Sequence, residues 1–294
     1  ELQYNNSLIV VSGDRSTFVD YYDIYTYDYS DYYTTGEYSV DFDGEAAVTN
    51  AIYYVTNDDL PTVYLLSGHG EADLTSTFET ALKNDSFLTD TLDLHTEDTV
   101  PEDCDCVFIN SPTADISTEE KDILLDYLEN GGKMLLITNY EGDVDFTNLL
   151  ELMEYYGCSL TDGIVIDPDS AYNLRGYTYY LLPEIISHDI TSSINEAGLY
   201  VLTPVAQGIT VSDTLRDTLS VTKLLVTSDS SYAKGDVDST TSEYEEGDID
   251  GPFAIAAAIS EGDTRIVWVS TGNLLDDTSD SLVSGGNQDM FLNS

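Results

Sequence analysis

The chain has 294 residues, with 56 acidic and 9 basic side chains and a formal net charge of −47 at pH 7. Binding to nucleic acid or to anionic lipid headgroups relies on Lys and Arg, so this charge balance argues against both as partners. A hydrophobic fraction of 41% is ordinary for a globular protein that is long enough to bury a substantial core.

The first sixty residues contain a predicted strand, a tyrosine-rich stretch and a predicted helix. The strand is the apolar run at residues 8–11. In residues 21–38 Tyr alternates with Asp, as in a half-buried strand, so we expect this stretch to cover a sheet edge. Stacking of its rings on sugars is the alternative. The helix, which ends before Pro61, is indicated by the helical spacing of Ala47, Val48, Ala51, Ile52 and Val55.

A short apolar run at residues 63–66 stops at a glycine-containing loop and is followed by a helical pattern. This is typical of the first strand of a parallel α/β sheet. Ligands of open α/β sheets bind at the carboxyl ends of the strands. The candidate ligand-contact residues of this loop are Ser67, Gly68, His69, Gly70 and Glu71.

Strand and helix patterns then alternate with short connections. A capping box of Ser117 and Glu120 predicts the start of the clearest helix, and Gly131 predicts its end. Strands are expected at residues 87–94, 106–110, 133–138 and 164–166. This alternation predicts an α/β fold with a doubly wound, mainly parallel sheet.

From about residue 167 the periodicity weakens, and residues 167–250 are expected to form a loop-rich elaboration of surface loops with a few strands. Regularity returns with two strands at residues 253–259 and 265–270. We expect residues 1–58 to pack on a core formed by residues 59–294, giving one compact domain overall.

The order of these segments resembles a known family, the GldG-like auxiliary component of bacterial ABC transport systems, which includes gliding-motility-associated proteins. The segments that carry the resemblance are FDGEAAVTNAIYYVT, VYLLSGHGE, DLHTEDTVPEDCDCVFINSPTADISTEEKDILLDYLENGGKMLLI, GPFAIAAAI, RIVWVSTGN and GGNQDMFLN. They cover nearly the whole chain, with gaps between about residues 167 and 218. Their order and spacing carry the resemblance together, since no single motif is diagnostic.

The resemblance implies a flavodoxin-like core, similar to class I glutamine amidotransferases, and a non-catalytic accessory role without a cofactor. It also implies an extracytoplasmic domain, tethered to the cytoplasmic membrane by helices that this sequence does not contain, with permease and ATPase subunits as partners. The absence of an initiator Met agrees with a piece of a longer protein. The resemblance names neither a small-molecule ligand nor a transported substrate.

Amidotransferase chemistry needs a cysteine on a sharp turn from strand to helix, with His and Glu supplied from later in the chain. The corresponding turn here reads Ser111-Pro112-Thr113. Cys106 lies at the wrong end of its strand, and His188 is the only histidine downstream. Amidotransferase activity is therefore not expected.

Two other functions stay open from the residues alone. Ser67, His69 and Glu71 have the residue types of a hydrolytic triad, although alternate residues of one tight loop rarely converge on one point. A hydrolase of a surface polymer would need this loop to enclose a cleft with Ser111 or Asn139 from neighbouring strand ends. A carbohydrate- or peptide-binding module would instead expose the tyrosines of residues 21–38.

Metal binding receives little support from the sequence. The three histidines are scattered along the chain and no HExxH motif occurs, which predicts no zinc site. Asp236 and Asp238 imitate the start of a calcium loop, but Thr241 and Gly247 stand where such a loop needs Gly and Glu. A solvated acidic loop is the expected structure, and an irregular calcium site is the alternative.

Overall fold

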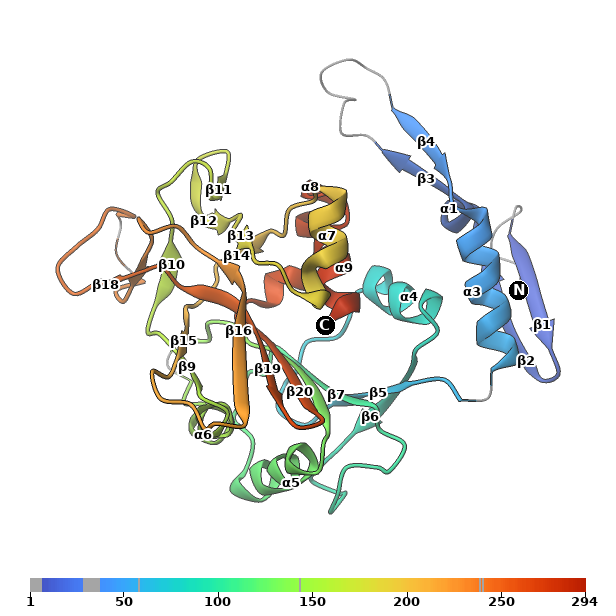
Figure 1. Cartoon of the computed structure of the whole chain (residues 1–294), viewed down its shortest axis with the longest axis horizontal. Helices are drawn as coiled ribbons and strands as arrows, with labels where there is room; N and C mark the ends of the chain where they lie inside the picture. Colours follow the sequence, from blue (N-terminus) through green and yellow to red (C-terminus); the bar gives the residue numbers. More distant parts are fainter. Residues whose placement is uncertain (1–6, 29–37, 58, 143, 238, 240) are drawn as a thin grey trace. The chain divides into compact units, whose positions relative to one another are not determined.

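The computed structural model describes residues 7–28, 38–57, 59–142, 144–237, 239 and 241–294 (Figure 1). The chain forms two compact units, one made of Glu1–Thr62 with Ser76–Leu88 and the other of Val63–Thr75 with Thr89–Ser294. Among the described residues, every helix is too short or too polar to cross a membrane.

The first unit contains two antiparallel strand pairs and short helices. The expected strand at residues 8–11 and the helix after Asp43 are both present. The elements are β1 (Leu8–Ser12) paired with β2 (Arg15–Val19), α1 (Tyr21–Ile24), β3 (Tyr25–Asp28) paired with β4 (Ser39–Phe42), α3 (Gly44–Thr56) and α4 (Ser76–Asn84).

The tyrosine-rich stretch differs from the expected continuous strand pattern at its start. Asp20 and Asp23 form a capping box, in which each carboxylate accepts a hydrogen bond from the backbone near the other, and this starts the helical turn α1. Local side-chain capping therefore overrides the alternation of Tyr and Asp. Tyr22 is 71% exposed. Residues 29–37 of the predicted stretch lie outside the described part of the chain.

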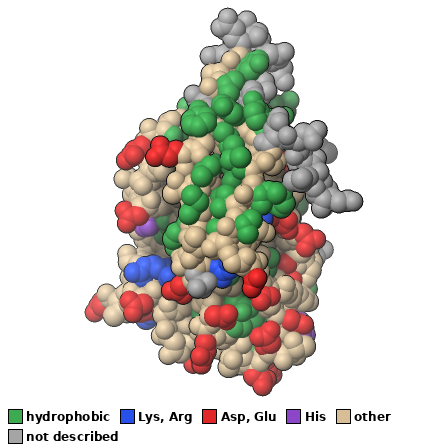
Figure 2. Space-filling view, turned by 90° about the vertical axis from the view of Figure 1, so that its right-hand side faces the viewer, with side chains coloured by type: hydrophobic (Ala, Val, Ile, Leu, Met, Phe, Trp, Pro, Cys, Tyr) green, Lys and Arg blue, Asp and Glu red, His purple; other side chains and the backbone are tan. Residues whose placement is uncertain are grey.

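Large apolar side chains of the first unit face solvent. On the β1–β2 hairpin and on β4 the exposed ones are Leu8, Ile9, Val11, Phe18, Val40 and Phe42. The space-filling view in Figure 2 shows hydrophobic side chains gathered on this unit. Gathered apolar surface of this kind calls for an explanation, whereas single exposed apolar residues do not.

The second unit is built on a ten-stranded sheet. Along its main path the strands are β13 (Glu184–Ile185), β16 (Leu219–Val226), β19 (Ala254–Glu261), β20 (Thr264–Val269), β8 (Lys133–Ile137), β7 (Cys106–Asn110), β5 (Thr62–Leu66) and β6 (Leu88–Leu92), with β15 (Ile209–Val211) and β9 (Cys158–Leu160) attached through β19. The pairs β5–β7, β7–β8 and β8–β20 are parallel, which confirms the predicted α/β class. Beyond β20 the pairings through β19 and β16 are antiparallel, so the sheet is mixed.

Helices lie on both faces of this sheet. Consecutive residues of β7 point to opposite faces, because side chains alternate along a strand. Ile109 joins the core beneath α5 (Thr118–Glu129) and α6 (Thr147–Tyr155), whereas the ring of Phe108 lies 5.6 Å from that of Phe291 in α9 (Gly286–Asn293). The sheet is therefore doubly wound around its parallel centre, as the alternation of elements predicts.

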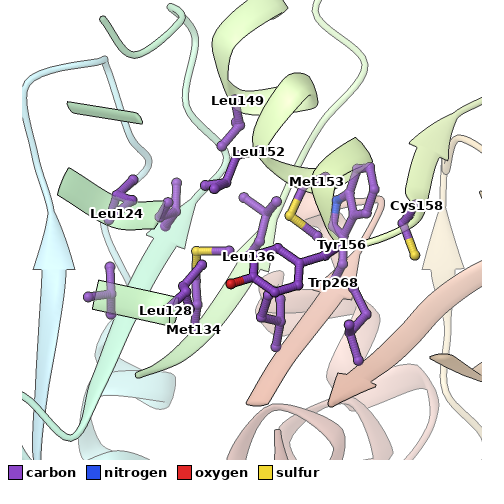
Figure 3. Close-up of a cluster of buried hydrophobic side chains, with 14 of the residues drawn as sticks. Leu124, Leu128, Met134, Leu136, Leu149, Leu152, Met153, Tyr156, Cys158 and Trp268 are labelled. Carbon is purple, nitrogen blue, oxygen red and sulfur yellow. The ribbon is translucent and has the colours of Figure 1, made fainter. Parts of the chain in front are cut away.

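The main hydrophobic core fills the space between the sheet and the helices α5 and α6 (Figure 3). Trp268 of β20 is fully buried, and its Nε1 donates a hydrogen bond to Oγ1 of Thr138 at 3.1 Å. The indole thus satisfies its one polar atom inside an apolar environment. Around it the figure labels Leu124, Leu128, Met134, Leu136, Leu149, Leu152, Met153, Tyr156 and Cys158.

Residues 167–250 are more ordered than the expected surface loops. They contribute to two small antiparallel sheets, β10 (Ile164–Ile166) with β17 (Tyr232–Lys234) and β18 (Ile249–Asp250), and β11 (Asn173–Leu174) with β12 (Tyr177–Leu181) and β14 (Thr203–Pro204). Fully buried Asp167 holds them to the main sheet, since it accepts hydrogen bonds from the backbone and the hydroxyl of Ser228. The polar composition indicated surface loops, because a contact between residues 61 positions apart cannot be seen in a local pattern.

The remaining short elements follow the same chain order. They are η1 (Asp189–Thr191), α7 (Ser192–Ala197), η2 (Gly272–Leu275) and α8 (Asp277–Leu282).

An ion pair on the rim of the second unit gives its stability a defined pH dependence. Hydrogen bonds from Arg216 and Thr218 lower the pKa of Glu261 from 4.5 to about 2. A lowered carboxylate pKa stabilises the fold above the unfolded pKa, and the stabilisation is lost as the pH falls through the folded pKa. We expect Glu261→Gln to destabilise the protein at pH 7, and the difference from the wild type to shrink from about pH 4.5 downward.

Urea unfolding of both proteins between pH 7 and pH 3 measures this difference. A destabilisation that stayed constant over that range would contradict the assignment of the ion pair.

Candidate functional site

The predicted site residues lie at the carboxyl ends of the parallel strands. The loop Ser67–Glu71 follows β5, Ser111 follows β7, Asn139 lies two residues beyond β8, and η2 follows β20. All belong to the second unit. The structure thus brings the candidate residues to one edge of the sheet, as parallel strands require.

The loop after β5 is held by the turn after β7. The carbonyl of His69 accepts hydrogen bonds from the backbone N–H groups of Thr113 and Ala114, at 3.0 and 2.9 Å. Asn110 and Ala72 form two further hydrogen bonds. The backbone N of Ala72 donates to the carbonyl of Asn110 at 2.8 Å, and Nδ2 of Asn110 donates to the carbonyl of Ala72 at 2.7 Å. These bonds bury the imidazole of His69, which is only 4% exposed.

Two carboxylates contact the ring of His69. Its Nδ1 lies 3.0 Å from Oε1 of Glu71, and its Nε2 lies 3.1 Å from Oε2 of Glu120. The hydrogen bond with Glu71, followed by that with Glu120, raises the pKa of His69 although burial opposes this. Burial alone would raise the pKa of Glu71, but its hydrogen bond from His69 lowers it overall. The three groups form a charge-assisted network.

Glu120 has two structural roles. In the α5 capping box its Oε2 accepts from the backbone N of Ser117 at 2.7 Å, and the hydroxyl of Ser117 accepts from the backbone N of Glu120. The same Oε2 faces His69. The sequence pattern identifies Glu120 as a capping residue and misses it as a site residue, because nothing local to helix α5 indicates a histidine 51 positions earlier.

His95 completes the cluster from the loop after β6. Its ring stacks on that of His69, with the centroids 5.2 Å apart and the planes inclined by 25°. Its Nδ1 lies 3.3 Å from Oε1 of Glu120 and 3.4 Å from Oδ1 of Asp93. Two of the three histidines expected to be scattered, His69 and His95, therefore lie side by side. His188 instead caps η1, where its Nδ1 accepts from the backbone N of Ile190.

Ser67 does not join His69 and Glu71 as a hydrolytic triad. Its hydroxyl donates to the carbonyl of Leu92 at 3.3 Å, while both ring nitrogens of His69 face carboxylates. A serine nucleophile needs its hydroxyl on the imidazole that serves as base. In the described structure the hydroxyl of Ser67 therefore makes no hydrogen bond to His69.

Ser111 and Asn139 flank Gly272 of η2. Ser111 is a buried residue with a left-handed φ of 49°, and its hydroxyl donates to Oδ1 of Asn110 at 3.2 Å. Oδ1 of Asn139 accepts from the backbone N of Gly272 at 2.6 Å. A Cβ on Gly272 would lie 2.3 Å from Oγ of Ser111, so the close approach requires glycine.

A hollow of about 550 Å³ opens at the end of β8. Asn139 lines it together with Asp162 and Gln207. The loop Ser67–Glu71 and Ser111 do not contribute to the lining of this hollow.

The cysteine thiols are poorly suited to nucleophilic attack at neutral pH. Burial raises the pKa of Cys106 to about 12 and that of Cys158 to about 11. Burial also raises the pKa of Cys104. Since the thiolate is the reactive form, these thiols stay protonated at pH 7.

The calcium candidate lies on an exposed acidic loop. Asp236 is exposed and its carbonyl accepts from the backbone N of Ser239, whereas Asp238 lies outside the described residues. Nearby, Nζ of Lys234 contacts Glu245 at 2.7 Å and Asp248 at 3.4 Å. At least part of the acidic charge of this loop is thus balanced by a lysine of the chain itself.

Comparison with known proteins places the chain in a family. Residues 60–294 match a family described as an ABC-type uncharacterized transport system. The chain belongs to this family. The resemblance to a GldG-like auxiliary component is confirmed at this level, and so is an accessory role in ABC transport. None of the curated proteins matches the chain.

Solved structures show a related fold. The mmIFT52 N-terminal domain is 15% identical, covers 78% of this chain and 93% of its own, and superposes with a TM-score of 0.57. A glutamine amidotransferase from Thermotoga maritima is 11% identical over 78% of this chain and 96% of its own, with a TM-score of 0.39. At these identities the likeness to the mmIFT52 domain concerns the fold alone.

The loop geometry gives a testable prediction at Gly70, whose φ is +72°. A Cβ there would lie 2.1 Å from Oγ1 of Thr113. We expect Gly70→Ala to destabilise the protein by about 1–3 kcal/mol, because it adds a clash to a strained backbone.

Gly142→Ala is the matched control, since Gly142 has a φ of +61° with open space around it. Its cost is expected to be about 1 kcal/mol, from the left-handed backbone alone. Equal unfolding free energies of the two variants in urea would show that contact with Thr113 does not hold the loop.

Proposed function

We propose that this chain is an extracytoplasmic, non-catalytic accessory domain of an ABC transport system and that it binds the membrane-embedded permease subunits. Family membership supports the association with transport.

The position of His69 is the observation that carries the non-catalytic role. A general base must accept a proton from a nucleophile, and for that one ring nitrogen must be free to face it. Both nitrogens of His69 face carboxylates, and the hydroxyls of Ser67 and Ser111 donate to Leu92 and Asn110. The imidazole and hydroxyl groups that hydrolysis would use are thus already hydrogen-bonded to other groups of the protein.

The exposed apolar residues of the first unit support a role in binding. Strongly acidic proteins are repelled by anionic membrane surfaces, so apolar contact with a membrane protein is the more favourable way to bind near a bilayer. Val11 and Phe18 of the β1–β2 hairpin are 63% and 52% exposed. Side chains of this kind are suited to a hydrophobic protein interface.

Protease treatment of intact spheroplasts, followed by co-purification, tests this proposal on the full-length protein. We expect the domain to be cleaved by external protease without lysis, and the uncleaved protein to co-purify with the permease subunit. Cleavage only after lysis would contradict the extracytoplasmic location.

Variants of the apolar hairpin test the partner surface. The double variant Val11→Ser and Phe18→Ser is expected to lower co-purification at least tenfold without changing thermal stability, because both side chains are exposed. Tyr177→Ser, at a residue of the second unit that is 57% exposed, is the control and is expected to have no effect. Equal co-purification of both variants would place the partner elsewhere.

The hydrolase alternative can be tested directly with an activity-based phosphonate probe, which labels serines that a base activates. We expect no labelling of the folded protein at Ser67 or Ser111, because neither hydroxyl donates to a histidine in the described structure. Labelling that disappears in Ser67→Ala or in Ser111→Ala would identify a catalytic serine and overturn the non-catalytic role.

A further inference from the structure

Three side chains at the carboxyl edge of the sheet bring potential metal ligands together. One ligand atom each from His69, His95 and Glu120 can be chosen so that all lie within 4.8 Å of one another. They come from three separate places in the fold, the loop after β5, the loop after β6 and the first turn of α5. Two imidazoles and one carboxylate make up a ligand set found in zinc proteins that keep a fourth position for water.

Glu120 provides an independent sign that a ligand belongs here. Its side chain is 4% exposed, and its Oε1 makes no hydrogen bond to any described residue. The nearest polar atom given for it is Nδ1 of His95 at 3.3 Å. Buried carboxylate oxygens without a hydrogen bond are costly, so an unpartnered one beside two imidazoles indicates a cation.

The distances suit a metal ion between these atoms. Two ligand atoms bound to one tetrahedral zinc lie about 3.3 Å apart, since each bond is about 2.0–2.1 Å long. Oε2 of Glu120 lies 3.1 Å from Nε2 of His69, and the other oxygen of the same carboxylate, Oε1, lies 3.3 Å from Nδ1 of His95. Because the ring of His95 stacks on that of His69, an ion between the three groups requires the exposed His95 side chain to turn its Nδ1 toward Glu120.

Glu71 orients the imidazole of His69 for metal binding. Its Oε1 lies 3.0 Å from Nδ1 of the imidazole and its Oε2 accepts from the backbone N of His69 at 2.8 Å. A carboxylate that accepts the Nδ1 proton directs the lone pair to Nε2, the nitrogen on the Glu120 side. This carboxylate–histidine pairing is the usual support of a metal-binding imidazole.

Gly68 leaves the space that His95 occupies. A Cβ at Gly68 would lie 2.8 Å from Nδ1 of His95 and 2.9 Å from its Cε1. His95 itself is 57% exposed, so a metal ion held by it would be reached from solvent. The fourth position would then be open to water or to an oxygen donor of a bound molecule.

We propose that His69 Nε2, His95 Nδ1 and the Glu120 carboxylate form a binding site for a zinc-type divalent ion, supported by Glu71 and open to solvent at its fourth position. The two nitrogen ligands favour zinc over calcium and magnesium, which prefer oxygen. The site goes beyond the accessory role, because it adds a ligand that connects two loops and the first turn of α5.

Zinc and cobalt titrations of the chelator-treated, full-length protein test the site. Excess Mg²⁺ is kept present, since a chain with a net charge of −47 attracts divalent ions over its whole surface. We expect one equivalent of Zn²⁺ to bind and to raise the melting temperature, and Co²⁺ to give the visible absorption of a tetrahedral site with nitrogen ligands.

His95→Ala is the decisive variant, because this exposed side chain can be removed without opening the core. We expect it to weaken zinc binding at least tenfold and to abolish the cobalt absorption. Glu71→Gln is expected to weaken binding about tenfold through the orientation of His69. His188→Ala is the matched control and should bind as the wild type does.

Equal zinc affinity of His95→Ala, His188→Ala and the wild type would show adventitious binding to the acidic surface and overturn the site. Absence of stoichiometric binding by the wild type would do the same. Esterase or amidase activity that appears only with zinc would instead uphold the metal site and overturn the non-catalytic role, so the two proposals fail separately.

Discussion

The structure of the second unit depends on one carboxylate that works in two places. Glu120 closes the capping box of α5 and also faces the imidazole of His69, so the start of a helix and the loop after β5 are fixed by the same side chain. A helix amino terminus carries partial positive charge, and Nε2 of His69 lies 3.1 Å from the same carboxylate oxygen. These partners compensate the lost hydration of Oε2, whereas Oε1 of the same carboxylate makes no hydrogen bond to a described residue.

The hydrogen bonds at the carboxyl edge of the sheet support the proposed non-catalytic role. The carboxyl edge of the parallel strands carries Ser, His, Asn and Glu side chains, as an enzyme would. Their hydrogen bonds, however, go to the chain itself: Ser67 donates to Leu92, Ser111 donates to its neighbour Asn110, and Asn139 accepts from Gly272. Polar groups that hold each other are satisfied and rigid, which suits recognition more than proton transfer.

Much of the fold could be predicted from local patterns, whereas the site could be predicted only in part. Alternating apolar and amphipathic segments indicate the strands and helices, and the capping box at Ser117 is a local feature that the structure confirms. The pairing of His69 with Glu120 joins residues 51 positions apart, and no periodicity reports such a contact. Likewise, Asp167 holds Ser228 across a stretch whose polar composition resembles surface loops.

The backbone connects the two units at more than one place, so a force on one unit can act on the other. It passes from one unit to the other at three places, residues 62–63, 75–76 and 88–89. Two of these crossings lie at the starts of β5 and β6, the strands whose far ends carry the loops of His69 and His95. A force on the amino-terminal unit would therefore pass along the backbone of β5 and β6, the two strands that lead to the stacked imidazoles.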